Sequence, residues 1–187
     1  MSHTFRLTYL ALLTAISLSL FVLEGMLPIP FLAPGAKLGL ANIVTVFALY
    51  TCSAPEALLV LCLRIGLASL FGGGPTVFLY SLAGGLLSFA AMLFLSRIII
   101  GHGHPDRPVR HGTMEDGRPM FSLPAVSAAG GFFHHLGQLL AALVMTGTPA
   151  LLTYLAILGP IGIATGLATG CVAGNIRKRI MKLATSY

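Results

Sequence analysis

The stretch from Val77 to Ile100 reads VFLYSLAGGLLSFAAMLFLSRIII and carries a single charge, on Arg97. It exceeds the roughly 20 apolar residues that a helix needs to cross the hydrocarbon core of a bilayer. Hydrocarbon offers no hydrogen-bond partners to free backbone groups, so a segment of this kind is expected to be helical. The stretch therefore predicts a transmembrane helix.

Five further apolar runs surround this stretch, and the six together predict an all-α integral membrane protein built as a six-helix bundle. The chain is 56% hydrophobic and only 9% charged, with a mean hydropathy of +0.92. A soluble domain carries about 25% charged residues. We expect one transmembrane domain over residues 1–187, because six spans with short turns use most of the chain. The predicted spans are residues 7–23, 38–51, 56–71, 77–100, 124–145 and 151–176, with a polar loop at about 102–123.

The basic residues fall almost entirely on one side of these spans. Two of the 11 Lys and Arg residues are exceptions: Lys37 lies on the far side, and Arg64 lies inside a span. Under the positive-inside rule, both termini and the 102–123 loop are expected to face the cytoplasm. The predicted localisation is the inner membrane of the cell. We interpret the net charge of +6 as topogenic, with contact to membrane lipid and no nucleic-acid partner. The basic residues on the predicted cytoplasmic side are Arg6, Arg97, Arg107, Arg110, Arg118, Arg177, Lys178, Arg179 and Lys182.

Arg64 is the first candidate for a functional residue. A charge near the middle of a span costs at least roughly 2.5–3.5 kcal/mol on insertion scales, so the side chain is expected to face a cavity or a partner. The alternative is a structural role, either in an ion pair with Glu24 or Glu56 or in a hydrogen bond.

Three further polar residues lie inside predicted spans. His134 and Gln138 are one helical turn apart and share a face, whereas His135 points about 100° away. Asn42 lies near the start of its span. These side chains are candidates for a ligand pocket, and a hydrogen bond between helices is the structural alternative for His134.

The segment from Glu24 to Lys37 is predicted as an external loop, although it is mostly apolar. Pro28, Pro30 and Pro34 stiffen it and deny it a helix. Such a loop is expected to fold back onto the bundle, either as a lid over a pocket or as a re-entrant plug without a ligand. If Lys37 and Arg64 both line the pocket, they favour an anionic ligand.

Small residues recur every four positions in two predicted spans. Ala11, Ala15 and Ser19 form one stripe, and the glycines at 162, 166, 170 and 174 form another. Such stripes allow a second helix to approach closely. Packing within the bundle is the simpler interpretation, and docking to another membrane subunit is the alternative.

Several kinds of chemistry have no motif in this sequence. No segment resembles a P-loop, a nucleophile elbow or a pair of carboxylates that could hold a metal. The pair His102 and His104 has ligand-type side chains, but we interpret its loop as solvated. The three cysteines are interpreted as buried thiols. We therefore predict no catalytic residue, no metal and no cofactor, and expect a protein that is not an enzyme.

One nine-residue segment resembles a known signature. Residues 34–42, PGAKLGLAN, resemble the PGxKLGxxN pattern of the Gx transporter family, which is also labelled heptaprenyl diphosphate synthase component I. Arg64, the segment SLAGGLLS at 81–88 and the segment HHLGQ at 134–138 also fit that family. The resemblance covers nearly the whole chain except the 102–123 loop. The last segment usually reads His-Asn-x-Gly-Gln in the family, so His135 stands where an asparagine is usual.

This family is grouped with the substrate-binding S components of energy-coupling factor transporters. The resemblance implies an S-component-like bundle with a pocket near the external face, capped by the first loop. It also implies docking on a transmembrane coupling subunit that cytoplasmic ATPases energise. Ala11 and Ala15 match the AxxxA surface that S components use for that contact.

The sequence thus favours a membrane subunit that binds a small-molecule substrate for uptake. The predicted substrate-binding residues are Lys37, Asn42, Arg64, His134 and Gln138, and the predicted docking residues are Ala11 and Ala15. One alternative is an accessory membrane component of heptaprenyl diphosphate synthesis, although the Asp-rich magnesium motifs of the usual prenyl synthases are missing from the sequence. Another is a structural partner of a membrane redox or quinone system.

Overall fold

The computed structural model describes residues 3–26, 39–100 and 123–184, without the side chains at 72–73, 97–100 and 181–184. All regular structure in this part of the chain is helical, which confirms the predicted all-α class. A π-helical turn, η1, covers Ser69–Gly73 between α3 and α4, and a 3₁₀ turn, η2, covers Pro149–Tyr154 ahead of α6. The six α-helices are α1 (His3–Met26), α2 (Asn42–Thr51), α3 (Ala54–Ala68), α4 (Gly74–Ile100), α5 (Leu123–Thr146) and α6 (Leu155–Ala184).

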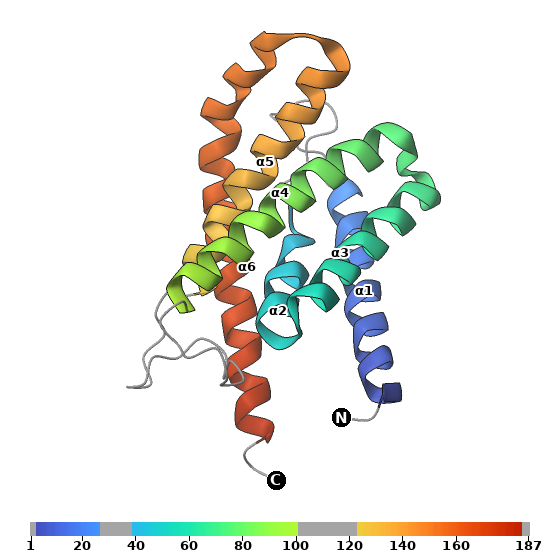
Figure 1. Ribbon diagram of the computed structural model, residues 1–187, viewed down its shortest axis with the longest axis vertical. Helices are drawn as coiled ribbons and strands as arrows, with labels where there is room; N and C mark the ends of the chain where they lie inside the picture. Colours follow the sequence, from blue (N-terminus) through green and yellow to red (C-terminus); the bar gives the residue numbers. More distant parts are fainter. Residues whose placement is uncertain (1–2, 27–38, 101–122, 185–187) are drawn as a thin grey trace.

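Five helical segments are long and apolar enough to cross a membrane, and the exception is α2. With 10 residues, α2 rises only about 15 Å, about half of a bilayer's hydrocarbon thickness. In Figure 1, α1 begins and α6 ends at the same, lower end of the molecule. The chain is therefore a multi-pass membrane protein.

The first two helix boundaries differ from the prediction. Helix α1 continues through Glu24 to Met26, so Glu24 is helical and does not begin a loop. Helix α2 begins at Asn42, four residues later than expected, because Gly39 turns the chain with a φ of 85°. Such a φ is readily adopted only by glycine. Asn42 thus opens α2 rather than lying one turn inside it.

Helices α5 and α6 pack against each other through backbone rather than through side chains, and their ribbons run side by side (Figure 1). A Cβ atom on Gly131 of α5 would collide with the carbonyl oxygen of Gly162 of α6. Gly166 and Gly170 of α6 meet α5 in the same way, over the backbone of Ser127 and Pro124. The glycine stripe of α6 therefore serves packing within the bundle.

Helices α1, α2 and α3 form the other side of the bundle around an aliphatic core. Leu10 and Leu13 of α1 pack with Val44 of α2 and with Val60 and Leu61 of α3. The opposite face of α1 is exposed, and it carries the stripe of small residues predicted from the sequence. The stripe consists of Ala11, Ala15 and Ser19.

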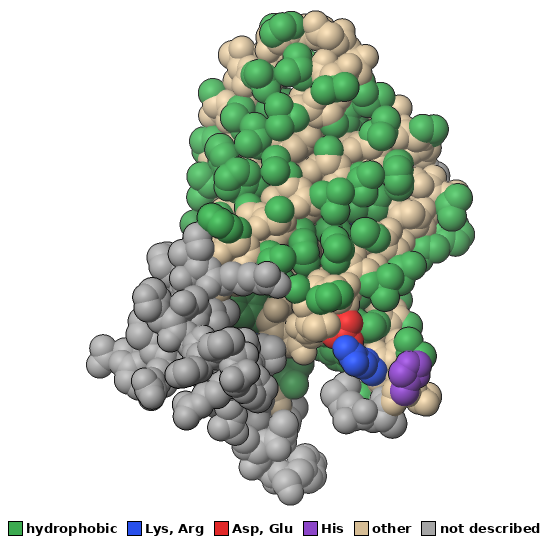
Figure 2. All heavy atoms as spheres, in the orientation of Figure 1, with side chains coloured by type: hydrophobic (Ala, Val, Ile, Leu, Met, Phe, Trp, Pro, Cys, Tyr) green, Lys and Arg blue, Asp and Glu red, His purple; other side chains and the backbone are tan. Residues whose placement is uncertain are grey.

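The surface in Figure 2 is hydrophobic over most of its height, and the drawn charged and histidine side chains gather near its lower end. Arg6 of α1 forms an ion pair with Glu56 of α3. Glu56 is therefore not the partner of Arg64. Cys62 and Cys171 are exposed and Cys52 is half-buried, so the prediction of buried thiols is wrong. An apolar exterior suits a bilayer, where a thiol need not be inside the protein.

Candidate functional site

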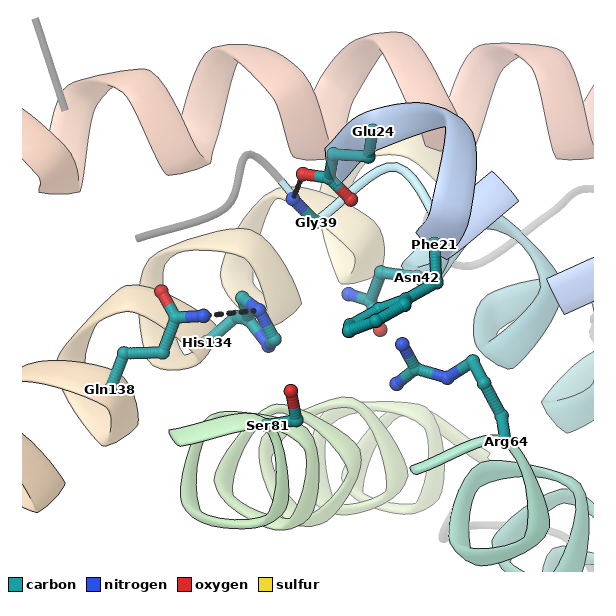
Figure 3. A pocket seen from close by; sticks show the side chains of 8 residues that line it. All are labelled: Phe21, Glu24, Gly39, Asn42, Arg64, Ser81, His134 and Gln138. Atoms are coloured by element: carbon teal, nitrogen blue, oxygen red, sulfur yellow. Dashed lines mark hydrogen bonds between the residues drawn. The ribbon is translucent and has the colours of Figure 1, made fainter. Parts of the chain in front are cut away.

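A small polar cavity lies where α1 to α5 converge (Figure 3). The space among its lining atoms has a volume of about 280 Å³. The centre of a water molecule can occupy about 10 Å³ of this volume. A space of that size holds about one water molecule. Polar side chains from five helices thus meet at one place in the bundle. The lining residues are Phe21, Glu24, Gly39, Asn42, Arg64, Ser81, His134 and Gln138.

Glu24 closes one side of the cavity and joins the end of α1 to the start of α2. Its carboxylate accepts hydrogen bonds from the backbone N–H groups of Gly39 at 2.5 Å and Leu40 at 3.1 Å. These N–H groups precede α2, where the helix dipole also favours a negative charge. Glu24 is only 4% exposed, so the sequence-based placement in an external loop is wrong. Its burial is compensated by the backbone groups that it binds.

Arg64 enters the cavity from α3 with its guanidinium group toward the centre (Figure 3). The residue is 4% exposed, and its Nε atom has no hydrogen-bond partner among the described residues. The guanidinium carbon lies 5.8 Å from the centre of the Phe21 ring, at cation–π distance. In the described part of the chain no carboxylate forms an ion pair with Arg64. The alternative predicted from the sequence, an ion pair between Arg64 and Glu24 or Glu56, is therefore not formed among these residues.

His134 and Gln138 occupy the side of the cavity formed by α5. Their Nε2 atoms are 3.2 Å apart, so one group donates and the other accepts, depending on the tautomer and the amide orientation. Gln138 Oε1 is buried and has no described hydrogen-bond partner. Gly84 of α4 permits this packing, because a Cβ atom there would lie 2.8 Å from the carbonyl oxygen of His134. The pair can offer the cavity either donors or acceptors.

His135 points away from the cavity, as its position in α5 predicts. It is fully buried on the side of α6, where a Cβ atom on Gly162 would lie 2.5 Å from its ring. Neither ring nitrogen has a hydrogen-bond partner among the described residues.

Asn42 is held at the cavity by a neighbour from another helix. Its side-chain amide donates a hydrogen bond of 3.1 Å to the hydroxyl oxygen of Ser88 in α4. This bond joins the short α2 to the long α4 and fixes the orientation of the asparagine side chain.

One comparison with known proteins gives a match. A model of the family described as heptaprenyl diphosphate synthase component I matches residues 13–176. The chain belongs to this family. No curated protein and no solved structure matches it.

The match to the heptaprenyl diphosphate synthase component I family includes all eight lining residues of the cavity. It also includes Ala15 but begins after Ala11, so it bears on only one of the two predicted docking residues. The family named from the PGAKLGLAN segment is therefore confirmed.

The structure brings together four of the five residues predicted for the pocket: Asn42, Arg64, His134 and Gln138. Lys37, with most of the predicted lid, lies outside the described residues. Ala11 and Ala15 lie on the exposed face of α1, away from the cavity. Sequence reasoning missed Phe21, Gly39 and Ser81 as lining residues. Gly39 and Ser81 belong to segments that carried the family resemblance, which is the signal that could have found them.

In the described part of the chain, no group of three or more His, Cys, Asp or Glu side chains could hold a metal ion. His102 and His104 lie outside the described residues.

Proposed function

We propose that the chain is the substrate-binding subunit of an uptake system for a small metabolite in the inner membrane. The observation that carries this proposal is the cavity, on which polar side chains from five helices converge. Buried polar groups in a membrane protein are costly, and they mark binding sites and transport pathways more often than packing. The proposed protein acts by binding, and the proposal assigns it no catalytic step.

The proposed subunit docks through the exposed stripe of α1 on a transmembrane coupling subunit driven by ATPases. Ala11, Ala15 and Ser19 are exposed, so packing within the bundle does not use this face. Small residues let a partner helix approach closely. The proposed topology has both termini in the cytoplasm, which the shared end of α1 and α6 supports.

The identity of a bound molecule tests the proposal most directly. The chain is purified from its native membrane in mild detergent, and mass spectrometry identifies any small molecule that dissociates on denaturation. A single metabolite retained at a near-stoichiometric level supports the uptake function. Its absence from several independent preparations, together with uptake that does not depend on the chain, would contradict it.

Affinity capture tests the docking face. The intact chain is expected to retain a coupling subunit and ATPases, and the double variant Ala11→Leu, Ala15→Leu is expected to lose them. Leu12→Ala, also on the exposed surface, is the matched control and should leave capture unchanged. Capture that survives the double variant would remove this face from the proposal.

The family description favours a second candidate function, an accessory role in heptaprenyl diphosphate synthesis. Prenyl diphosphate formation that requires this chain in a reconstituted membrane would support that role. Formation that proceeds equally without it would leave the uptake function as the better explanation.

A further inference from the structure

The cavity contains two charged side chains that differ in how well their hydrogen-bonding groups are satisfied. Among the lining residues that the structure describes, Glu24 and Arg64 are the two of the Asp, Glu, Lys and Arg types. The Glu24 carboxylate accepts two backbone hydrogen bonds at the start of α2, so it has a structural function. The guanidinium carbon of Arg64 lies 5.8 Å from the centre of the Phe21 ring, and its Nε atom has no hydrogen-bond partner among the described residues. A buried cation without hydrogen bonds is costly unless another group supplies them.

On the basis of the uptake function proposed above, we propose that the cavity binds a small monocarboxylate, whose carboxylate pairs with the guanidinium of Arg64. A guanidinium presents parallel N–H groups that match the two oxygens of a carboxylate. The carboxylate would give the guanidinium of Arg64 a directly hydrogen-bonded counter-charge in a region of low dielectric constant. Ser81, which points into the cavity from α4 in Figure 3, and Gln138, which also lines the cavity, hydrogen-bond the remainder of the ligand.

The charge count favours one negative charge on the ligand over several. Within residues 3–26, 39–100 and 123–184, Arg64 is the single Lys or Arg that lines the cavity, and Glu24 repels any further anion from the same space. A diphosphate carries more charge and is generally bound with divalent cations. In the described ranges, no cluster of ligand-type side chains could supply such a cation. The cavity therefore suits a carboxylate better than a prenyl diphosphate.

The size of the cavity limits the ligand to a compact molecule. The free space holds about one water molecule, so the surrounding helices must separate slightly to admit an organic acid. The aromatic ring of Phe21 gives this acid an apolar surface beside the guanidinium.

The test is thermal unfolding of the purified full chain in detergent, followed by circular dichroism at constant ionic strength. The probes are a mixture of propionate, lactate and benzoate, then inorganic phosphate, inorganic pyrophosphate, choline and glycerol, each added separately. We expect the monocarboxylate mixture to raise the melting temperature in a saturable manner. Arg64→Gln should abolish this rise, and Arg179→Gln, at an exposed arginine of α6, should retain it.

The melting temperature of the empty protein separates a binding residue from a structural one. Arg64→Gln removes an unpaired buried charge, so the empty variant should melt at the same temperature as the wild type or higher. If Arg64→Gln does not fold, Arg64→Lys takes its place. Lysine keeps the charge but loses the parallel N–H pair, so carboxylate affinity should fall on the order of tenfold.

Each other outcome overturns the carboxylate assignment. A rise with phosphate or pyrophosphate alone means that the site selects a different anion. A rise with choline or glycerol that Arg64→Gln retains means that Arg64 is not a ligand-binding residue. No rise with any probe also counts against the assignment. The uptake function fails separately, when a monocarboxylate binds but its uptake into cells does not depend on the chain.

Discussion

Helices α5 and α6 meet through glycines, whereas α1 and α2 meet through a buried carboxylate and two backbone N–H groups. The first contact leaves no room for a Cβ atom at Gly131, Gly162 or Gly166, and a hydrogen bond of 3.1 Å joins the Ser127 and Thr169 hydroxyls across it. The second depends on a few polar groups whose loss leaves others unsatisfied in an apolar medium. The cavity lies between these two kinds of packing. The α5 side thus provides a closely packed wall that carries His134 and Gln138, and the α1–α3 side provides Glu24, Asn42 and Arg64.

The largest effect is expected at the glycine contact. Gly131→Ala places a methyl group on the carbonyl of Gly162 and should force α5 and α6 apart, at a cost of about 3 kcal/mol. Thermal unfolding in detergent measures the loss. The matched control is Gly66→Ala in α3, where no atom lies within 4 Å and the change should be neutral or slightly stabilising. Equal behaviour of the two variants would contradict the close packing of α5 on α6.

The next effect is expected at Glu24. Glu24→Ala leaves the N–H groups of Gly39 and Leu40 without their acceptor and should cost about 2 kcal/mol. Glu24→Gln retains one carbonyl acceptor and should lose roughly half as much. Unfolding of both variants in the same detergent gives the comparison. A Glu24→Ala variant as stable as the wild type would mean that the carboxylate does not hold α1 to α2.

A smaller effect is expected at the hydrogen bond between Asn42 and Ser88. Interhelical hydrogen bonds in membranes contribute about 0.6 kcal/mol on average. A double-mutant cycle with Asn42→Ala and Ser88→Ala should give a coupling energy of this size. The same cycle with Asn42→Ala and Ser96→Ala, a residue bonded within its own helix, should give none.

Chemical labelling of Cys52 is expected to have the smallest effect on stability. Its purpose is to determine which side of the membrane this residue faces. In a variant with Cys62→Ala and Cys171→Ala, a membrane-impermeant maleimide should label Cys52 only from the cytoplasmic side. Burial raises the pKa of the Cys52 thiol above its ordinary value. The reactive thiolate is therefore scarce at pH 7, and the labelling rate should still be rising at pH 9. Labelling from the outside of intact cells would reverse the proposed orientation.

The sequence predicted the helices and most of the cavity for the same physical reason. Long apolar runs must be helical in lipid, and rare polar residues within them must find polar surroundings. This reasoning identified Asn42, Arg64, His134 and Gln138. It did not identify Phe21 and Ser81, because one phenylalanine or serine in an apolar run is unremarkable until the helices are packed.

Two kinds of feature were not predictable from local sequence. Glu24 belongs to α1 because it binds backbone groups 15 and 16 residues further along the chain, and such a partner is not visible in a local pattern. The exposure of Cys62 and Cys171 was also missed. In a bilayer both the interior and the exterior of the protein are apolar, so hydrophobicity does not distinguish a buried position from one that faces lipid.

The lone guanidinium at the centre of the bundle has an electrical consequence. A charge held within the bilayer senses the voltage across it, at about 2.3 kcal/mol per elementary charge and 100 mV for a complete crossing. An empty cavity and one that holds an anion beside Arg64 differ by one elementary charge at that depth. If the cavity binds an anion as proposed, the resting potential of the cell acts on the empty and the occupied states unequally and shifts the equilibrium between them.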